Sequence, residues 1–241
     1  MAAKKYQYIE LEKRPDGVAM IWLDNRHDPV NMLSSVFGDE LEAAIDRIEK
    51  DSKIRAAVLI SRKPDNFIVG ANINELKSQK TPAEATALDA GAQDIFNRVE
   101  ACAKPFVAAI HGACMGSGLE TVLCCHYRIA TNHPKTQLAL PEVKLGLMPA
   151  AGGTQRLPKL VGLQAALDMM LTGKTVYAKK AKSMGLVDDV VIPFALAEQA
   201  IQAAHRLVEE ETKKEPKKRP LPVRVMEDVG PARDLVFRKA K

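Results

Sequence analysis

The sequence has little of what extracellular and membrane-spanning proteins need. It contains 4 cysteines in 241 residues, and two of them, Cys124 and Cys125, are adjacent. Such a set does not suggest a disulfide scaffold and fits a reducing compartment. No apolar run approaches the roughly 20 residues that a transmembrane helix needs, and no apolar signal-peptide core follows Lys4 and Lys5. We therefore expect a cytoplasmic protein with no membrane span, or one in an organelle whose targeting sequence is absent from this chain.

Excess charge of one sign is almost absent outside one tail. The formal net charge is +5, but residues 213–241 contain ten Lys or Arg and four Asp or Glu, which leaves the other 212 residues at −1. The positive charge therefore does not form a folded basic face. Because no recognised binding motif accompanies it, we do not expect nucleic acid as a partner.

The composition predicts one core. The chain is 46% hydrophobic and 27% charged, as in ordinary globular proteins. After residue 212 the sequence becomes basic and Pro-rich. Residues 1–212 are predicted to form one domain, and residues 213–241 a linker that leads to a domain missing from this chain.

Apolar runs alternate with helical patterns along the first 212 residues. The predicted strands are 6–12, 17–24, 56–61, 105–112, 127–131 and 136–140, the first two forming a hairpin, and the predicted helices are 34–50, 83–101, 154–160, 163–172, 178–184 and 194–212. Ser34 or Ser35 caps the first helix, whose predicted apolar face includes Val36 and Phe37. The alternation predicts an α/β fold with largely parallel, buried strands.

A carboxylate lies near the start of an apolar helix. The small residues Gly116, Ser117 and Gly118 predict a turn that opens a helix, where free backbone N–H groups and the helix dipole favour an oxyanion. Glu120 follows in the first turn, although an ionised acid is costly to desolvate among apolar neighbours. This segment alone leaves open whether Glu120 is catalytic or an ordinary first-turn acid.

A second carboxylate, Glu142, follows Pro141 at the end of a short predicted strand and is again among apolar residues. Two carboxyl groups in apolar settings can hold different protonation states at neutral pH, as paired acid and base catalysis requires. The alternative is a loop acid paired with Lys144 or Arg156.

A third segment follows the predicted strand at 56–61 and opens a helix or turn. Gly70 and Ala71 allow close backbone approach, so the Ala71 N–H is a candidate donor to the same oxyanion. The alternative is a plain turn in which Asn72 or Asn74 caps a helix.

Together the three segments resemble the crotonase (enoyl-CoA hydratase/isomerase) superfamily. The family patterns A-G-A-D-I and G-G-G-x-E correspond to residues 69–73 and 116–120, and P-E-x-x-L-G-x-x-P-x-x-G-G-T-Q-R-L matches residues 141–157. The resemblance extends over about residues 5–212. It is closest to the N-terminal hydratase half of the α-subunit of multifunctional fatty acid β-oxidation complexes. In that branch a basic, Pro-rich linker leads to a 3-hydroxyacyl-CoA dehydrogenase, whose G-x-G-x-x-G fingerprint is not found here.

The resemblance implies a fold and a set of roles. The fold would be a crotonase-like ββα spiral with C-terminal helices. The N–H groups of Ala71 and Ser117 would hold the thioester oxygen of an acyl-CoA, Glu120 would activate water and Glu142 would deliver a proton. Val30, Gly70, Asn72 and Gly116 would contact the CoA ester. Coenzyme A is part of the substrate, so no separate cofactor is implied.

Two positions depart from the family pattern. Asn72 replaces the usual Asp, and Ser117 replaces a Gly, so Ser117 can serve as a donor only if its backbone conformation suits a residue with a Cβ. Cys124, Cys125 and the next residue, His126, suggest a metal site, but consecutive helix positions point apart and we predict packing instead. No metal is expected. Arg156 is predicted to close the Gly152-Gly153 loop, with contact to a CoA phosphate as the alternative.

The sequence therefore predicts an enzyme that hydrates trans-2-enoyl-CoA to 3-hydroxyacyl-CoA. One alternative is Δ3-Δ2-enoyl-CoA isomerisation in the same pocket, and another is a non-catalytic acyl-CoA-binding or assembly module. The expected partners are the acyl-CoA substrate and either further copies of the chain or a thiolase subunit.

Overall fold

The computed structural model describes residues 6–210, so the predicted linker at 213–241 lies outside the described residues. The chain opens with the antiparallel hairpin of β1 (Ile9–Lys13) and β2 (Val18–Leu23). The Arg14 N–H donates to the Val18 carbonyl and closes the predicted turn, in which Gly17 has a φ of +85°. This left-handed conformation is open to glycine at little cost.

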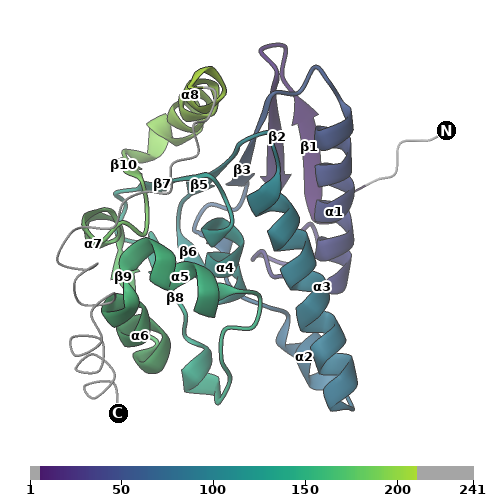
Figure 1. Ribbon diagram of the computed structural model, residues 1–241, viewed down its shortest axis with the longest axis vertical. Coiled ribbons are helices and arrows are strands. Elements are labelled where there is room, and N and C mark those ends of the chain that lie inside the picture. The colour runs from purple at the N-terminus through teal and green to yellow at the C-terminus, as the bar shows by residue number, and fades with distance from the viewer. Residues whose placement is uncertain (1–5, 211–241) are drawn as a thin grey trace.

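Two sheets are built from repeated strand pairs (Figure 1). A large sheet has the strand order β1-β2-β3-β5-β7-β10, and a small sheet has the order β4-β6-β8-β9. In each pair the first strand joins the large sheet and the next one the small sheet; the pairs are β3 (Ala56–Ser61) with β4 (Asn66–Ile68), β5 (Phe106–Ile110) with β6 (Ala113–Met115), and β7 (Tyr127–Thr131) with β8 (Gln137–Ala139). Helices follow these pairs, which is the predicted ββα spiral.

The strands of the large sheet are parallel from β2 to β10 (Asp189–Val191). All residues of β3 and β5 are buried, as two-sided burial of parallel strands requires. One face packs on α8 (Leu196–Glu209), through residues such as Val58, Val107 and Ala200. The other face joins a larger core with the helices and the small sheet.

The two long helices on that larger core each begin after a capping residue, and the cap of the first was predicted. Ser34 caps α1 (Ser35–Lys50), and Thr81 caps α3 (Pro82–Ala101). These two helices lie side by side in Figure 1, and Phe37 and Phe96 are buried. Val36, predicted for the apolar face, is instead 42% exposed. It lies in the first turn, where Phe37 takes the core-facing position.

The remaining elements are short. They are α2 (Ile73–Ser78), α4 (Ser117–Leu123), the 3-10 helix η1 (Glu142–Leu145), α5 (Gly153–Val161), α6 (Leu163–Thr172), β9 (Val176–Tyr177), α7 (Ala178–Ser183) and the 3-10 helix η2 (Pro193–Ala195). The predicted helices at 154–160, 163–172 and 178–184 are confirmed. Within residues 6–210, no helix is both long and apolar enough to cross a membrane.

Candidate active site

The segments at 69–73 and 116–120 meet at the ends of two neighbouring strands. β4 and β6 pair in parallel, so the residues that follow both strands emerge at the same sheet edge. A Cβ built on Gly116 would lie 3.7 Å from the Gly70 Cα. The two candidate oxyanion segments therefore lie close together. That they bind the same oxyanion stays a prediction.

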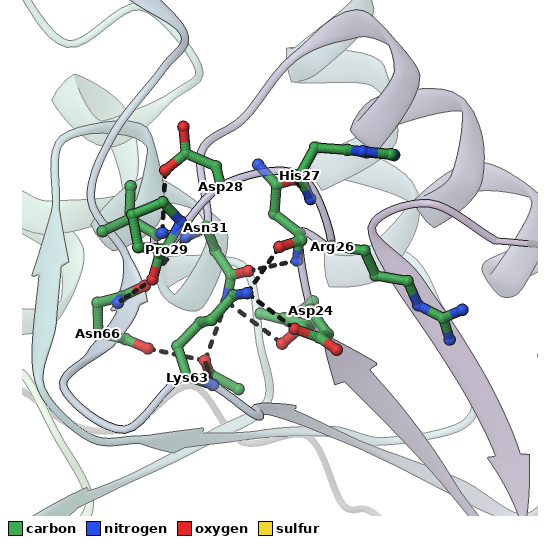
Figure 2. A network of polar contacts seen from close by, with 12 residues as sticks. Asp24, Arg26, His27, Asp28, Pro29, Asn31, Lys63 and Asn66 are labelled. Carbon is green, nitrogen blue, oxygen red and sulfur yellow. Dashed lines mark hydrogen bonds and ion pairs between the residues drawn. The ribbon is translucent and has the colours of Figure 1, made fainter.

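A buried polar network holds the segment at 69–73 (Figure 2). The Asn31 side chain donates to the Phe67 carbonyl over 3.0 Å and to Ser61 Oγ over 2.9 Å, and its Oδ1 accepts from the Asn25 N–H. The Asn31 backbone carbonyl accepts from the Val69 N–H over 2.9 Å. Asn31 thus fixes the chain on both sides of β4 and just before Gly70.

Lys63 extends the same network to the end of β2 and the loop after it. Its ammonium group contacts the Asp24 carboxylate at 2.9 Å and donates to the Asn25 carbonyl over 2.6 Å. Figure 2 shows Asp24 and Lys63 beside the Asn31 side chain. The loop that carries Val30, one of the predicted CoA contacts, is therefore tied to the chain that leads to Ala71.

The Ala71 N–H is directed away from the chain that pairs with it. Leu33 and Ala71 form an isolated parallel bridge, in which the Leu33 N–H donates to the Gly70 carbonyl and the Asn72 N–H donates to the Leu33 carbonyl. These bonds use the groups on either side of Ala71. Within residues 6–210 the Ala71 N–H has no acceptor, so it is available to a ligand.

The second N–H belongs to the first residue of α4. Gly116, not Ser117, takes the unusual conformation, with φ of +55°, and no described residue other than glycine has a positive φ. A serine therefore fits at position 117 without strain. As the first residue of the helix, Ser117 has an N–H with no intrahelical partner. Gly118 is required for packing, because a Cβ there would come within 2.3 Å of the Ile68 carbonyl oxygen.

Glu120 is buried and accepts backbone hydrogen bonds from Gly153 and Ala151. Its side chain comes from the first turn of α4, the residue is 2% exposed, and its Oε1 accepts from the Gly153 N–H over 2.7 Å. Burial raises the pKa of the Glu120 carboxyl to about 7, and the charges of Glu142 and Asp89 act in the same direction. The hydrogen bond from Gly153 opposes this rise, because it stabilises the ionised form.

Glu142 approaches the junction of the two segments from η1. A Cβ on Gly116 would lie 3.1 Å from Glu142 Oε1. Glu142 Oε2 is buried, and no hydrogen-bond partner for it is found within residues 6–210. Burial raises the pKa of the Glu142 carboxyl. Burial therefore favours the protonated form of this carboxyl more than in an exposed glutamate.

The alternative pairing of Glu142 with Lys144 or Arg156 is wrong. Arg156 instead forms an ion pair with Glu100 at 2.8 Å, and no ion pair of Glu142 is found in the described part of the chain. The charge of Glu142 raises the pKa of Glu120, and no ion pair of either carboxyl group is found within residues 6–210.

The remaining predicted contacts are placed in different ways. Gly70 and Gly116 lie at the junction of the two segments. Val30 lies in the loop of the Asn31 network, where its N–H donates to Asp28 Oδ1. Asn72 caps α2 with its Oδ1, as the alternative interpretation predicted. The CoA-binding roles of these residues stay predictions.

Two contributors were not predicted from the sequence. Gly153 supplies an N–H that donates to Glu120. The sequence around Gly152 and Gly153 does not indicate which acceptor this N–H binds. Asp89 of α3 is partly buried, and burial raises the pKa of its carboxyl. Its spacing of four residues from Gln93 and eight from Asn97 places all three on one helix face, which is the signal that could have identified it.

The cysteines and histidine of residues 124–126 pack as predicted. Cys124 and Cys125 are buried, and His126 Nδ1 accepts from the Phe106 N–H over 3.0 Å. In the described residues no cluster of three His, Cys, Asp or Glu side chains has the arrangement of a metal site.

Similarity to known proteins agrees with this arrangement. The sequence matches the family described as enoyl-CoA hydratase/isomerase over residues 13–216. It is 45% identical over 232 residues to the fatty acid oxidation complex subunit alpha of Shewanella sp. (strain ANA-3), and this match covers 96% of the chain and 32% of the relative. The chain thus spans about a third of the length of the curated relatives it matches.

Solved structures show the same fold. An enoyl-CoA hydratase structure from Geobacillus kaustophilus has a TM-score of 0.82 and 31% identity, with 98% of this chain and 90% of that chain covered. The enoyl-CoA hydratase from Bacillus anthracis has a TM-score of 0.78 and 29% identity, with 97% of this chain and 89% of that chain covered.

Proposed function

The chain belongs to the enoyl-CoA hydratase/isomerase family, and we propose that its site hydrates trans-2-enoyl-CoA to 3-hydroxyacyl-CoA in fatty acid β-oxidation. The observation that carries this proposal is the convergence of two carboxyl groups and two backbone N–H groups. Glu142 and Gly70 both lie near Gly116, since a Cβ built there would be 3.1 Å from Glu142 Oε1 and 3.7 Å from the Gly70 Cα. Glu120 lies in the first turn of the helix that Ser117 begins.

The two N–H groups are assigned to the thioester carbonyl. In addition of water to the double bond, negative charge develops on this oxygen as an enolate forms. The N–H groups of Ala71 and Ser117 would donate to it, and the N-terminus of α4 adds positive potential. Loss of one such donor lowers a rate by about a hundred- to a thousandfold.

The two carboxyl groups are assigned to proton transfer. Ionised Glu120 would take a proton from water as the water oxygen bonds to C3, and protonated Glu142 would deliver a proton to C2. Burial raises the pKa of both carboxyl groups, that of Glu120 to about 7, so the pair can gain or lose a proton near neutral pH. Which group is the acid and which the base is assigned from the resemblance to the family. Each such role contributes about 10² to 10⁴ in rate.

An exposed apolar loop suits the acyl part of the substrate. It joins the two carboxyl positions: Glu142 precedes it, and the Gly152-Gly153 turn that holds Glu120 follows it. Within it, Leu145, Leu147 and Met148 are exposed, Met148 to 68%. We assign the acyl chain to this side of the site and the CoA portion to the side of Val30 and Asn72. Because Asn72 Oδ1 is used in capping, Asn72 would contact CoA through its amide NH₂.

One observation favours Δ3-Δ2-enoyl-CoA isomerisation as a second activity. Glu120 is held by Gly153, whereas no partner for Glu142 Oε2 is found in the described residues. A carboxyl oxygen that no described group occupies can accept a proton at one carbon and return it at another. We therefore assign isomerisation mainly to Glu142.

The longer relatives suggest how this domain works with others. They are named as subunits of a fatty acid oxidation complex. We propose that this domain acts beside a 3-hydroxyacyl-CoA dehydrogenase domain that would consume its product, and that it assembles with a thiolase subunit or with further copies of itself.

The test is the loss of absorbance of the conjugated thioester when crotonyl-CoA is hydrated. The chain and its Glu120→Gln variant are compared, with Glu209→Gln of the exposed end of α8 as the matched control. We expect turnover by the wild type and the control and a loss of at least a hundredfold in Glu120→Gln. If crotonyl-CoA is not hydrated, 2-decenoyl-CoA tests a longer chain. Binding of both esters without hydration of either would support the non-catalytic module instead.

A further inference from the structure

Arg156 is a buried cation close to the site, yet it contacts neither catalytic carboxyl group. Its side chain is 6% exposed. The guanidinium donates from Nε to Glu100 Oε2 over 2.8 Å, from Nη2 to Asn97 Oδ1 over 2.6 Å, and from Nη1 to the Ala151 carbonyl over 3.1 Å. Its charge is therefore balanced by Glu100, and a guanidinium group that makes three directed contacts is rigidly held.

The guanidinium lies directly against the turn that precedes α5. A Cβ on Gly152 would come within 2.1 Å of Arg156 Nη1, and Gly152 has a φ of +102°. The Arg156 N–H also donates to the Gly152 carbonyl over 3.0 Å. One residue thus binds two successive carbonyl groups of the turn, those of Ala151 and Gly152.

The next N–H group of the same turn reaches Glu120. Gly153 follows Gly152 and donates to Glu120 Oε1 over 2.7 Å. A shift of a few tenths of an ångström in the turn would lengthen or bend this bond, and charge-assisted hydrogen bonds weaken steeply with such changes. A change in the position of Arg156 would therefore move residues 151–153, and with them the hydrogen bond to Glu120.

One face of α3 anchors the arrangement from the other side. Asn97 and Glu100 hold the guanidinium, and Gln93, one turn earlier, donates to the Ala150 carbonyl over 2.6 Å. These residues recur at helical spacing and face the turn at 150–153. The turn is thus fixed to a long helix rather than left as a free loop.

We propose that Arg156 is a positioning residue for Glu120, which fixes the Ala151–Gly153 turn so that the Gly153 N–H stays aimed at Glu120 Oε1. This role deepens the proposed function. The expected effect on kcat rests on that function, whereas the expected effect on the ionisation of Glu120 does not. Three charged or titratable groups bear on Glu120, namely Glu142 of η1, Asp89 of α3 and, through the turn alone, Arg156. A weaker bond from Gly153 would raise the pKa of the Glu120 carboxyl, since that bond favours the ionised form.

The test compares Arg156→Met and Arg156→Lys with the wild type. The first readout is the ionisation of Glu120 itself, followed by carbon-13 NMR of glutamate-labelled protein, with Glu120→Gln to assign the resonance. The second is the pH dependence of kcat for enoyl-CoA hydration. We expect the Glu120 titration and the acidic limb of kcat to move up together by about one pH unit, with about a fivefold loss of kcat at pH 7 and little change of KM. Lysine should not rescue, because it cannot reproduce the guanidinium fork.

Arg98→Met is the matched control. Arg98 lies on α3, the helix that carries Asn97 and Glu100, but it forms ion pairs with Glu42, Asp46 and Glu49 at the surface. The Arg98→Met variant should leave the titration of Glu120 and the acidic limb of the kcat profile unchanged, even if its stability falls. Because removal of the buried Arg156 can impair folding, a double variant of two exposed residues, Asn97→Ala with Glu100→Gln, releases the guanidinium and should give a smaller shift in the same direction.

The proposal is overturned if a folded Arg156→Met or the double variant titrates Glu120 as the wild type does. A wild type that does not hydrate enoyl-CoA would contradict the proposed function. The NMR titration would still decide the role of Arg156, so the two failures are distinguishable.

Discussion

Glu142 Oε1 lies so close to the α-carbon of Gly116 that a Cβ there would stand 3.1 Å from it. Gly116 immediately precedes the N–H of Ser117, so the proposed proton donor and one proposed oxyanion donor lie beside the same short stretch of backbone. Because β6 leads into Gly116 and η1 begins at Glu142, the relative position of the two depends on how the small sheet packs. This coupling makes Gly116 a sensitive point of the site.

Gly116→Ala should therefore lower hydration strongly. The backbone at Gly116 has φ of 55° and ψ of −127°, a conformation that costs a residue with a Cβ about 1–3 kcal/mol. Relief of this strain would redirect the Ser117 N–H and displace Glu142. We expect kcat to fall by at least about a hundredfold, as for loss of an oxyanion donor, measured with crotonyl-CoA.

Gly91→Ala is the control for that substitution. Gly91 lies in α3, has no atom within 4 Å of a built Cβ and has no positive φ. The change should leave activity intact and stabilise the helix by up to about 1 kcal/mol. Equal loss of activity in both variants would contradict a specific role for the Gly116 conformation.

Glu142→Gln should separate catalysis from binding. The amide keeps the shape of the side chain but cannot deliver a proton, so hydration should fall by about 10² to 10⁴. Affinity for butyryl-CoA, a saturated ester that cannot react, should change less than about threefold in calorimetric titration. A variant that hydrates at the wild-type rate would remove Glu142 from the mechanism.

Much of the framework was predictable because it depends on local patterns. The strands at 56–61 and 127–131 and the helix at 163–172 have the predicted bounds, since long apolar runs and helical periodicity carry the signal. The strands β4, β6, β9 and β10 were not predicted as strands. Each has two or three residues, too few for a period to show, and their existence depends on partners far along the chain.

The site was predictable in part for the same reason. Glu120, Glu142 and the Gly70 and Gly116 turns stand out as unusual residues in their local context. What could not be predicted is which groups meet. The bond between Gly153 and Glu120 joins residues 33 apart, and the network of Asn31 joins residues up to 36 apart. Such pairs are set by the packing of the two sheets.

Asn31→Asp should weaken both stability and catalysis. The Asn31 amide donates to Ser61 Oγ and to the Phe67 carbonyl, and a carboxylate cannot donate to either acceptor. A buried acceptor left without its donor costs about 1–3 kcal/mol, and the strand that leads to Ala71 would shift. We expect a lower melting temperature and a lower kcat.

Asn74→Asp is the matched control for Asn31. Asn74 is exposed in the first turn of α2, where an acid is favoured by the helix dipole. Its stability and kcat should match those of the wild type. If Asn31→Asp has an unchanged melting temperature, the Asn31 network does not support the segment at 69–73.

Glu120→Gln should make the protein more stable at alkaline pH while it abolishes hydration. Burial raises the pKa of Glu120 from its ordinary 4.5 to about 7 in the folded chain. Below pH 4 the carboxyl is protonated in both the folded and the unfolded chain, so it contributes no pH-dependent difference. Between the two values the unfolded chain loses the proton first, and above pH 7 the folded chain carries a buried anion. At 1.36 kcal/mol per pH unit the ionised group then costs about 3 kcal/mol.

Glutamine removes this cost, because it stays neutral and its carbonyl oxygen still accepts from the Gly153 N–H. The gain in the free energy of unfolding should be near zero at pH 4 and reach about 3 kcal/mol at pH 8, which corresponds to a melting temperature higher by about 6–12 °C. Glu209→Gln, at the exposed end of α8, should show no such pH-dependent gain. Thermal unfolding at both pH values measures the difference. A Glu120→Gln variant that gains nothing at pH 8 would mean that the folded protein carries this carboxylate without strain, and the base would then have to be activated by substrate binding.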